Sequence, residues 1–179
     1  MRPAPDEYTP YHETYISLVQ ADDIVTALQA QGNETAAMLL RLPPAMADYR
    51  YAPDKWTIKQ VLGHVTDGER VLAYRALRFA RGDRTPLTGY EQDDFMRGAN
   101  FEPRTLASLI EEFEAVRRST VLLFASLEPE AWSRRGVANQ NEISVRALAW
   151  LIAGHEMHHR RALQEKYFRS KTPFAGAMR

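Results

Sequence analysis

Apolar residues recur at helical spacing along four long segments of the chain. The first segment covers residues 22–42, and the proline pair at 43–44 ends it because proline cannot continue a helix. The third covers residues 105–127 and carries an unbroken apolar stripe, formed by Leu106, Leu109, Ile110, Phe113, Val116, Val121 and Phe124. The spacing therefore predicts amphipathic helices in both places.

The second and fourth segments have clear starting signals. Thr57 and Gln60 fit a capping box, in which the two side chains satisfy each other's free backbone N–H groups. The helix that begins there runs through Phe79 and ends at Gly82, a residue type suited to the left-handed conformation after a helix. The fourth helix is predicted from Ser144 to about Phe168.

The remaining stretches are predicted to be connections. Residues 8–19 are rich in aromatic and β-branched types and are predicted to form an extended arm over the bundle, while residues 82–104 form the main crossover. The loop that contains Gly136, Asn139 and Asn141 shows no convincing strand. Four helices of about 20 residues, one long crossover and no sheet predict an all-α four-helix bundle. We expect a single domain over residues 1–179, with an N-terminal arm (1–21) and a C-terminal tail (169–179).

Composition excludes several classes of function. Twenty-three basic side chains balance 23 acidic ones, so no overall field attracts nucleic acid or an anionic membrane. No apolar run reaches the roughly 18 residues of a membrane span, and no apolar segment follows the N-terminus as a signal peptide requires. The chain has no cysteine, which excludes disulfides, thiolate ligands and a cysteine nucleophile. These features predict a cytoplasmic protein with a small-molecule partner.

Three histidines lie on inward-facing helical stripes. His155 and His159 are four residues apart, so they share one helix face, which also carries Leu148, Leu151, Ile152, Ala162 and Leu163. His64 lies on the apolar stripe of the second helix, and Gly68 leaves space one turn further on. Three imidazoles from two helices can bind one divalent metal ion and leave a fourth coordination position open, as in catalytic zinc sites. Buried histidines hydrogen-bonded to their neighbours are the alternative.

Residues 155–159 also match the H-E-x-x-H signature of zinc proteases. Such an enzyme usually takes its third ligand from further downstream and binds its peptide beside a sheet, yet only 20 residues follow His159 and no sheet is predicted. Glu156 is a candidate to orient a ligand or accept a proton, the alternative being an exposed ion pair. His158 lies near the edge of the inward face, where it is a candidate for a supporting position beside the ligands.

The segment Trp56–Val65, followed by Asp67, Glu69 and Arg70, resembles the second-helix motif of the DinB/YfiT-like superfamily. Residues 154–159 resemble the fourth-helix motif of that superfamily, about ninety residues later, and the likeness extends to residues 74–79 and 145–149. The resemblance implies a bundle with up-down-down-up connectivity, a homodimer, and a zinc- or nickel-type ion held by three histidines, which correspond to His64, His155 and His159. Members of the superfamily are described as metal-dependent hydrolases, and some resemble S-transferases that use bacillithiol or mycothiol.

The leading hypothesis is an enzyme in which the ion activates water or a low-molecular-weight thiol. Arg75, three helical turns beyond His64, is a candidate to bind an anionic group of the substrate, and Asp67 is a candidate to hold an imidazole N–H. The 83–104 segment, with Tyr90, Glu91 and Asp93, has a length and composition suited to covering the pocket. The competing class is a non-catalytic, stress-related metal-binding protein. A role in DNA repair has no support, because there is no basic stripe.

Overall fold

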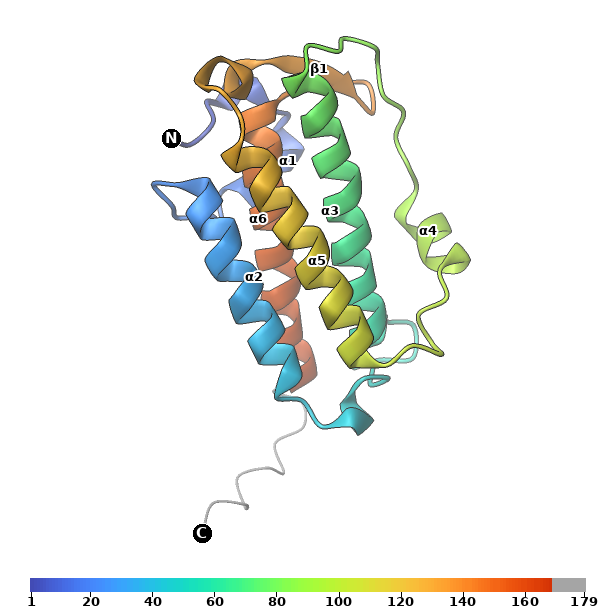
Figure 1. The fold of residues 1–179 in the computed structure, drawn as a ribbon. Helices are drawn as coiled ribbons and strands as arrows, with labels where there is room; N and C mark the ends of the chain where they lie inside the picture. The colour runs from blue at the N-terminus through green and yellow to red at the C-terminus, as the bar shows by residue number, and fades with distance from the viewer. Residues whose placement is uncertain (169–179) are drawn as a thin grey trace.

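The computed structural model describes residues 1–168, and four long helices run side by side within them (Figure 1). They are α2 (Ile24–Leu40), α3 (Ile58–Ala80), α5 (Leu106–Ala125) and α6 (Val145–Ala162). α2 and α6 run in one direction and α3 and α5 in the other, which is the up-down-down-up order. The parallel pair α3 and α5 requires the long crossover, because the chain must return along the whole bundle between them. The expected tail at 169–179 lies outside the described residues.

Each long helix begins at a side-chain cap, formed in chain order by Asp23, Thr57, Thr105 and Ser144. The predicted capping box is confirmed: the Gln60 N–H donates to Thr57 Oγ1 at 3.1 Å, and the Thr57 N–H donates to Gln60 Oε1 at 2.8 Å. Gly82 adopts the expected left-handed conformation after α3, with φ of 82°. α6 continues into a π-helical turn, Leu163–Phe168. Local sequence signals therefore define where the bundle helices start and stop.

The four helices close around a shared apolar interior. α3 packs against α5 and α6, and α2 packs against the same two helices from the other side. The largest apolar side chains of the interior are almost fully buried and include Phe79, Phe113, Phe124 and Trp150. Since α3 and α6 are direct neighbours, side chains on their facing stripes can meet inside the bundle.

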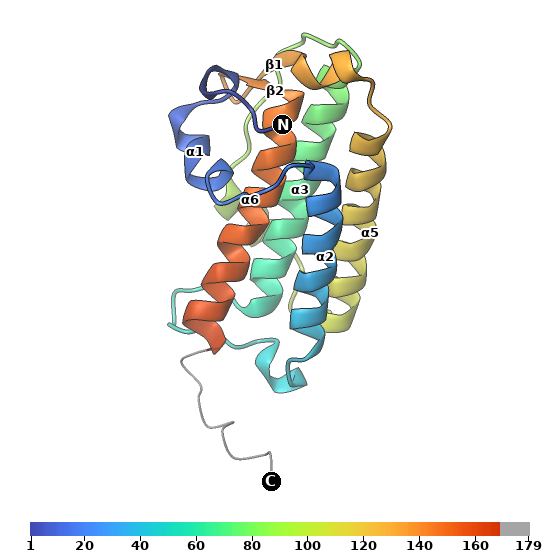
Figure 2. The same ribbon diagram turned by 90° about the vertical axis from the view of Figure 1, so that its left-hand side faces the viewer.

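The N-terminal arm differs from the prediction in its conformation. Residues Pro10–Ile16 form a helix, α1, which packs on the outer face of α6 (Figure 2). Pro10 occupies the first helical turn, where its fixed φ and missing N–H cost nothing. The aromatic and β-branched composition suggested an extended segment, but docking against α6, with Ile16 fully buried, favours the helix.

The prediction that the chain has no strand is also wrong. β1 (Arg135–Ala138) and β2 (Asn141–Ser144) form an antiparallel hairpin, with Arg135 opposite Ser144 and Ala138 opposite Asn141. Asn139 and Gln140 both have positive φ, 50° and 65°, as a two-residue hairpin turn requires. The strands have four residues each, which is too short for an alternating pattern to stand out. A further short helix, α4 (Gln92–Gly98), lies within the crossover.

A buried charge network joins all four bundle helices at the side chain of Arg117 on α5. Its Nη2 atom lies 2.8 Å from Glu69 Oε2 on α3, and its Nη1 atom lies 2.7 Å from Glu156 Oε2 on α6. Nη1 also donates to the Leu28 carbonyl oxygen of α2 at 2.9 Å. The hydroxyl of Thr35, also on α2, donates to the other carboxylate oxygen of Glu156. One guanidinium thus contacts three neighbouring helices.

The network has two carboxyl groups for one guanidinium, and all three side chains are at most 5% exposed. Burial opposes the charge on Arg117, but the carboxylates outweigh it and raise the pKa of Arg117. Burial raises the pKa of Glu156, and Arg117 only partly offsets this effect. Arg117 passes close to α2, where a Cβ atom on Gly32 would lie 2.7 Å from Arg117 Cγ. The guanidinium therefore compensates carboxyl groups that have no access to water.

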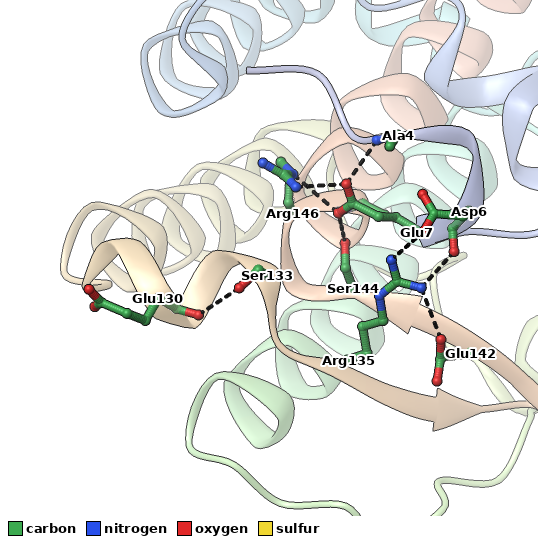
Figure 3. A network of polar contacts seen from close by, with 10 residues as sticks. Ala4, Asp6, Glu7, Glu130, Ser133, Arg135, Glu142, Ser144 and Arg146 are labelled. Atoms are coloured by element: carbon green, nitrogen blue, oxygen red, sulfur yellow. Dashed lines mark hydrogen bonds and ion pairs between the residues drawn. The ribbon is translucent and has the colours of Figure 1, made fainter.

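A second network fixes the N-terminal segment to the start of α6 (Figure 3). Glu7 is buried and accepts hydrogen bonds from Ser144 Oγ at 2.6 Å and from Arg146 Nη2 at 2.7 Å. Beside it, Arg135 on β1 pairs with Asp6 at 2.7 Å and with Glu142 at 3.0 Å. Burial disfavours the charged form of Glu7, but the bonds from Arg146 and Ser144 prevail and lower its pKa. The carboxylate of Glu7 is thus stabilised in the folded protein.

Replacing Arg117 by methionine is expected to lower the free energy of unfolding by about 3–5 kcal/mol, because Glu69 and Glu156 lose the buried cation that both of them contact. Glu156→Gln, which removes one carboxyl and keeps its shape, is expected to cost less. Urea denaturation of both variants measures the difference. Equal losses in the two variants would contradict this account of the network.

Glu7→Gln is expected to lower the free energy of unfolding by about 1–3 kcal/mol at pH 7. Since the folded pKa of Glu7 lies below its unfolded value, the stabilisation is present above about pH 4.3 and is lost as pH falls through the folded pKa. Urea denaturation of wild type and variant across this range should show the two stabilities converging in acid. A constant difference at all pH values would show that the charge of Glu7 contributes nothing.

Candidate metal centre

His64 on α3 and the pair His155 and His159 on α6 converge inside the bundle. The Nε2 atom of His155 lies 3.1 Å from Nε2 of His64 and 3.2 Å from Nε2 of His159. One nitrogen from each ring falls within 4.8 Å of the other two. The structure thus brings together the three histidines that the sequence singled out, because α3 and α6 pack face to face.

Hydrogen bonding cannot satisfy this arrangement by itself. A neutral imidazole nitrogen carries either one proton or one lone pair, so Nε2 of His155 can complete only one of its two short contacts. A divalent cation resolves the conflict, because all three Nε2 lone pairs can point at it. Zinc–nitrogen bonds of about 2.0–2.1 Å in a tetrahedral site place the nitrogens about 3.3 Å apart. The donor set and its spacing therefore fit a single divalent ion.

The rings are held in the form that binds metal. Burial lowers the pKa of His64 to about 4, with the Asp93 carboxylate opposing the shift. Burial, followed by the neighbouring His64, lowers the pKa of His155 to about 3. Burial and His155 lower the pKa of His159 to about 2. At neutral pH all three imidazoles are uncharged and keep lone pairs for a cation.

Aromatic side chains support the imidazoles from two sides. The ring of Trp56, just before α3, lies 4.8 Å from the ring of His64. Tyr15 of α1 meets the ring of His155 at 5.7 Å and the ring of His158 at 5.4 Å, both edge to face. These contacts restrict ring rotation, so the nitrogens stay oriented toward one another.

Four other side chains were singled out from the sequence, and two of them have their polar contacts elsewhere. Asp67 forms an ion pair with Arg70 at 3.0 Å. Glu156 is 1% exposed and contacts Arg117 and Thr35 in the buried network, rather than an imidazole. The alternative for Glu156, an exposed ion pair, is wrong because Glu156 and its partner Arg117 are both buried.

Of the other two, His158 adjoins the cluster, while Arg75 lies three helical turns from His64 on α3. The ring of His158 lies 5.1 Å from that of His159, in an edge-to-face contact. Arg75 is half-buried and donates one hydrogen bond to the Thr88 carbonyl oxygen at 3.1 Å. No carboxylate within residues 1–168 pairs with Arg75, and burial lowers its pKa without removing its charge.

Sequence reasoning missed Tyr15 and Trp56 as parts of this site, and it placed Tyr90 only in the crossover expected to cover the pocket. A Cβ atom on Gly68 would lie 3.1 Å from His155 Cε1 and 3.7 Å from the Tyr90 hydroxyl oxygen, so Tyr90 approaches the centre from the crossover. The sequence contained a signal for Trp56, because this residue immediately precedes the capping box of the helix that carries His64. Tyr15 had no such signal, because it reaches the site only through the docking of α1. The length and composition of the crossover pointed to Tyr90, but only the folded position of the crossover brings this side chain to His155.

A cavity of about 300 Å³ opens beside His159. Its walls include Trp56, His158 and the aromatic rings of Tyr51 and Tyr167. The histidine cluster is therefore not sealed inside the bundle, and a small molecule has room next to it. No helix within residues 1–168 is long and apolar enough to cross a bilayer.

Comparison with known proteins agrees with this architecture. The family model described as DinB superfamily matches residues 27–163. YfiT from Bacillus subtilis, described as a probable metal-dependent hydrolase with an unusual four-helix bundle topology, superposes with a TM-score of 0.67 at 15% identity. The match covers 95% of this chain and 93% of YfiT.

A mycothiol-dependent maleylpyruvate isomerase also superposes, with a TM-score of 0.65 at 13% identity. The match covers 81% of this chain and 61% of that protein. At these identities the two structures establish the fold. None of the curated proteins matches the chain.

His155→Ala is expected to weaken zinc or nickel binding at least about 100-fold, because loss of a direct ligand should cost no less than loss of a supporting partner. Elemental analysis and competition with a chelator measure the effect. His12→Ala is the matched control, since His12 lies on α1 and its ring nitrogen contacts Thr9. Equal metal content in the wild type and His155→Ala would contradict the proposed centre.

Proposed function

The chain belongs to the DinB superfamily, and on that premise we propose that it is an enzyme that depends on a divalent metal ion held by His64, His155 and His159. The observation that carries the proposal is the pair of short Nε2 contacts at His155, which one imidazole cannot satisfy by hydrogen bonding. Zinc and nickel suit such a set of neutral nitrogen ligands. We propose one of these two as the native ion.

A bound ion of this kind lowers the pKa of a coordinated water or keeps a coordinated thiol deprotonated, which supplies a nucleophile at neutral pH. Three protein ligands leave room for such a group in a tetrahedral site. The chain itself has no cysteine, so a thiol must arrive as a cosubstrate. Hydrolysis and thiol S-transfer are therefore the two reaction types that the site supports.

Arg75 is proposed to bind an anionic group of the substrate. Its guanidinium has one hydrogen bond, to Thr88, and no carboxylate partner within residues 1–168, so its charge is available to a ligand. It lies on the same helix as His64, three turns further along. His158 is proposed as a supporting residue, because its ring packs against that of His159 and lines the adjoining cavity.

Glu156 is not needed for this mechanism, because its carboxyl group is committed to Arg117 and Thr35. The zinc-protease alternative loses support for the same reason. The hairpin, which is the one sheet within residues 1–168, adjoins the start of α6, whereas the histidines lie toward its end. An extended peptide paired to that sheet would lie far from the site.

A non-catalytic metal-binding protein is the second candidate. The buried position of the ligands favours it, since the same ion would also stabilise the contact between α3 and α6. The cavity beside His159 favours the enzyme, because it gives a small molecule access to the cluster. A homodimer and a cytoplasmic location follow from the family resemblance and the composition, and both stay predictions.

The metal-loaded protein is expected to accelerate conjugation of bacillithiol to monochlorobimane, or hydrolysis of an activated ester, above the uncatalysed rate. His155→Ala should return the rate to background. Arg75→Ala should retain the metal and raise KM for an anionic substrate about tenfold, because a hydrogen bond to a charged group is lost. Metal binding without turnover in a broad thiol and ester screen would favour the non-catalytic candidate.

A further inference from the structure

The segment that carries Tyr90 is anchored at several points of the fold. The Leu87 N–H donates to the Val137 carbonyl at 2.9 Å, and the Asn139 N–H donates to the Leu87 carbonyl at 3.0 Å, so β1 holds residue 87. Arg75 donates to the carbonyl of Thr88, the next residue. The crossover is therefore fixed immediately before Tyr90, and the position of this side chain is set by the hairpin and by α3.

The hydroxyl of Tyr90 shares one small space with the ring of His155. This space is the volume that a side chain on Gly68 would fill, since a Cβ there would lie 3.1 Å from His155 Cε1 and 3.7 Å from the Tyr90 oxygen. Cε1 lies between the two ring nitrogens: Nδ1 lies 3.5 Å from the same Cβ position, and Nε2 faces the other two histidines. Glycine at 68 thus allows a phenol from the crossover to stand next to the imidazole cluster.

The hydroxyl of Tyr90 is free to donate a hydrogen bond at this position. Within residues 1–168 it has no hydrogen-bond partner, whereas the hydroxyl of the other tyrosine at the site, Tyr15, is 3.3 Å from that of Tyr11. Burial raises the pKa of Tyr90, so the phenol keeps its proton at neutral pH. Its ring is braced by Phe95 of α4 at 4.5 Å. A positioned, protonated and unused donor is suited to binding a ligand.

We propose that Tyr90 is a catalytic residue of this centre, whose hydroxyl donates a hydrogen bond to the small anionic or oxygen-bearing group that binds beside the three histidines. The proposal rests on the proposed function, because it needs an ion at His64, His155 and His159. It assigns the crossover a direct part in binding, beyond that of covering the pocket.

The test uses cobalt(II)-loaded protein, whose visible absorption reports the ligands of the ion, and azide as the probe. Titration with azide should change the spectrum of the wild type and give a dissociation constant. In Tyr90→Phe this constant should rise about tenfold, because one hydrogen bond to a charged ligand is lost. Tyr74→Phe is the matched control, since Tyr74 is 51% exposed on α3 and its hydroxyl contacts Arg78. The control should bind azide as the wild type does.

The outcomes separate this proposal from the proposed function. If Tyr90→Phe and Tyr74→Phe both bind cobalt and azide as the wild type does, the role of Tyr90 is overturned and the metal site stands. If Tyr90→Phe loses cobalt itself, the side chain supports the site instead of the ligand, which also overturns the proposal. If the wild type binds no cobalt, the donor role fails together with its premise at the metal. If the wild type binds cobalt without responding to azide, the donor role alone is overturned and the metal site stands.

Discussion

The bundle depends on one buried cation. Arg117 reaches Glu69, Glu156 and a backbone carbonyl of α2, so its guanidinium touches every other helix of the bundle from its place on α5. Taking these charges out of water is costly, and the cost is offset only when all partners are present in the right geometry. A helix that rotated or slid would leave a carboxyl group unpaired in the interior. The network therefore selects one relative arrangement of the four helices.

That arrangement determines the geometry of the histidine cluster. Glu69 lies five residues after His64, and Glu156 is adjacent to His155, so the ion pairs fix the same turns of α3 and α6 that carry the ligands. The two sites occupy different sides of α6: the carboxyl group of Glu156 faces α2 and α5, while the imidazoles face α3. Charges are compensated on one side, and neutral nitrogen donors are concentrated on the other. Burial then keeps the imidazoles uncharged, which is the form that a cation needs.

The connections complete the site that the helices begin. α1 brings Tyr15 against His155, and the crossover brings Tyr90 to the space left by Gly68. Both segments are held by contacts far from the histidines, namely the Glu7 network at the start of α6 and the backbone pairing of Leu87 with β1. The surroundings of the metal centre can therefore change with the connections while its ligands stay constant.

The amino-acid sequence by itself determined the four bundle helices, their capped ends and the three metal-ligand candidates. Thr57 with Gln60, Gly82 and the spacing of His155 and His159 act over one or two helical turns, and helical geometry converts such spacing directly into position. The inward direction of His64 followed from the apolar stripe around it for the same reason. The motif resemblance then supplied the up-down-down-up connectivity, which periodicity alone does not contain.

The tertiary structure decided what depends on contacts between distant segments. The partner of Glu156 is 39 residues away in the sequence, and nothing local indicates that its carboxyl group faces Arg117 instead of the histidines. The helix at residues 10–16, the four-residue strands and the approach of Tyr90 are likewise stabilised by docking and not by local propensity. Short elements have few periodic positions and little intrinsic stability, so their conformation becomes definite only when the rest of the protein packs against them.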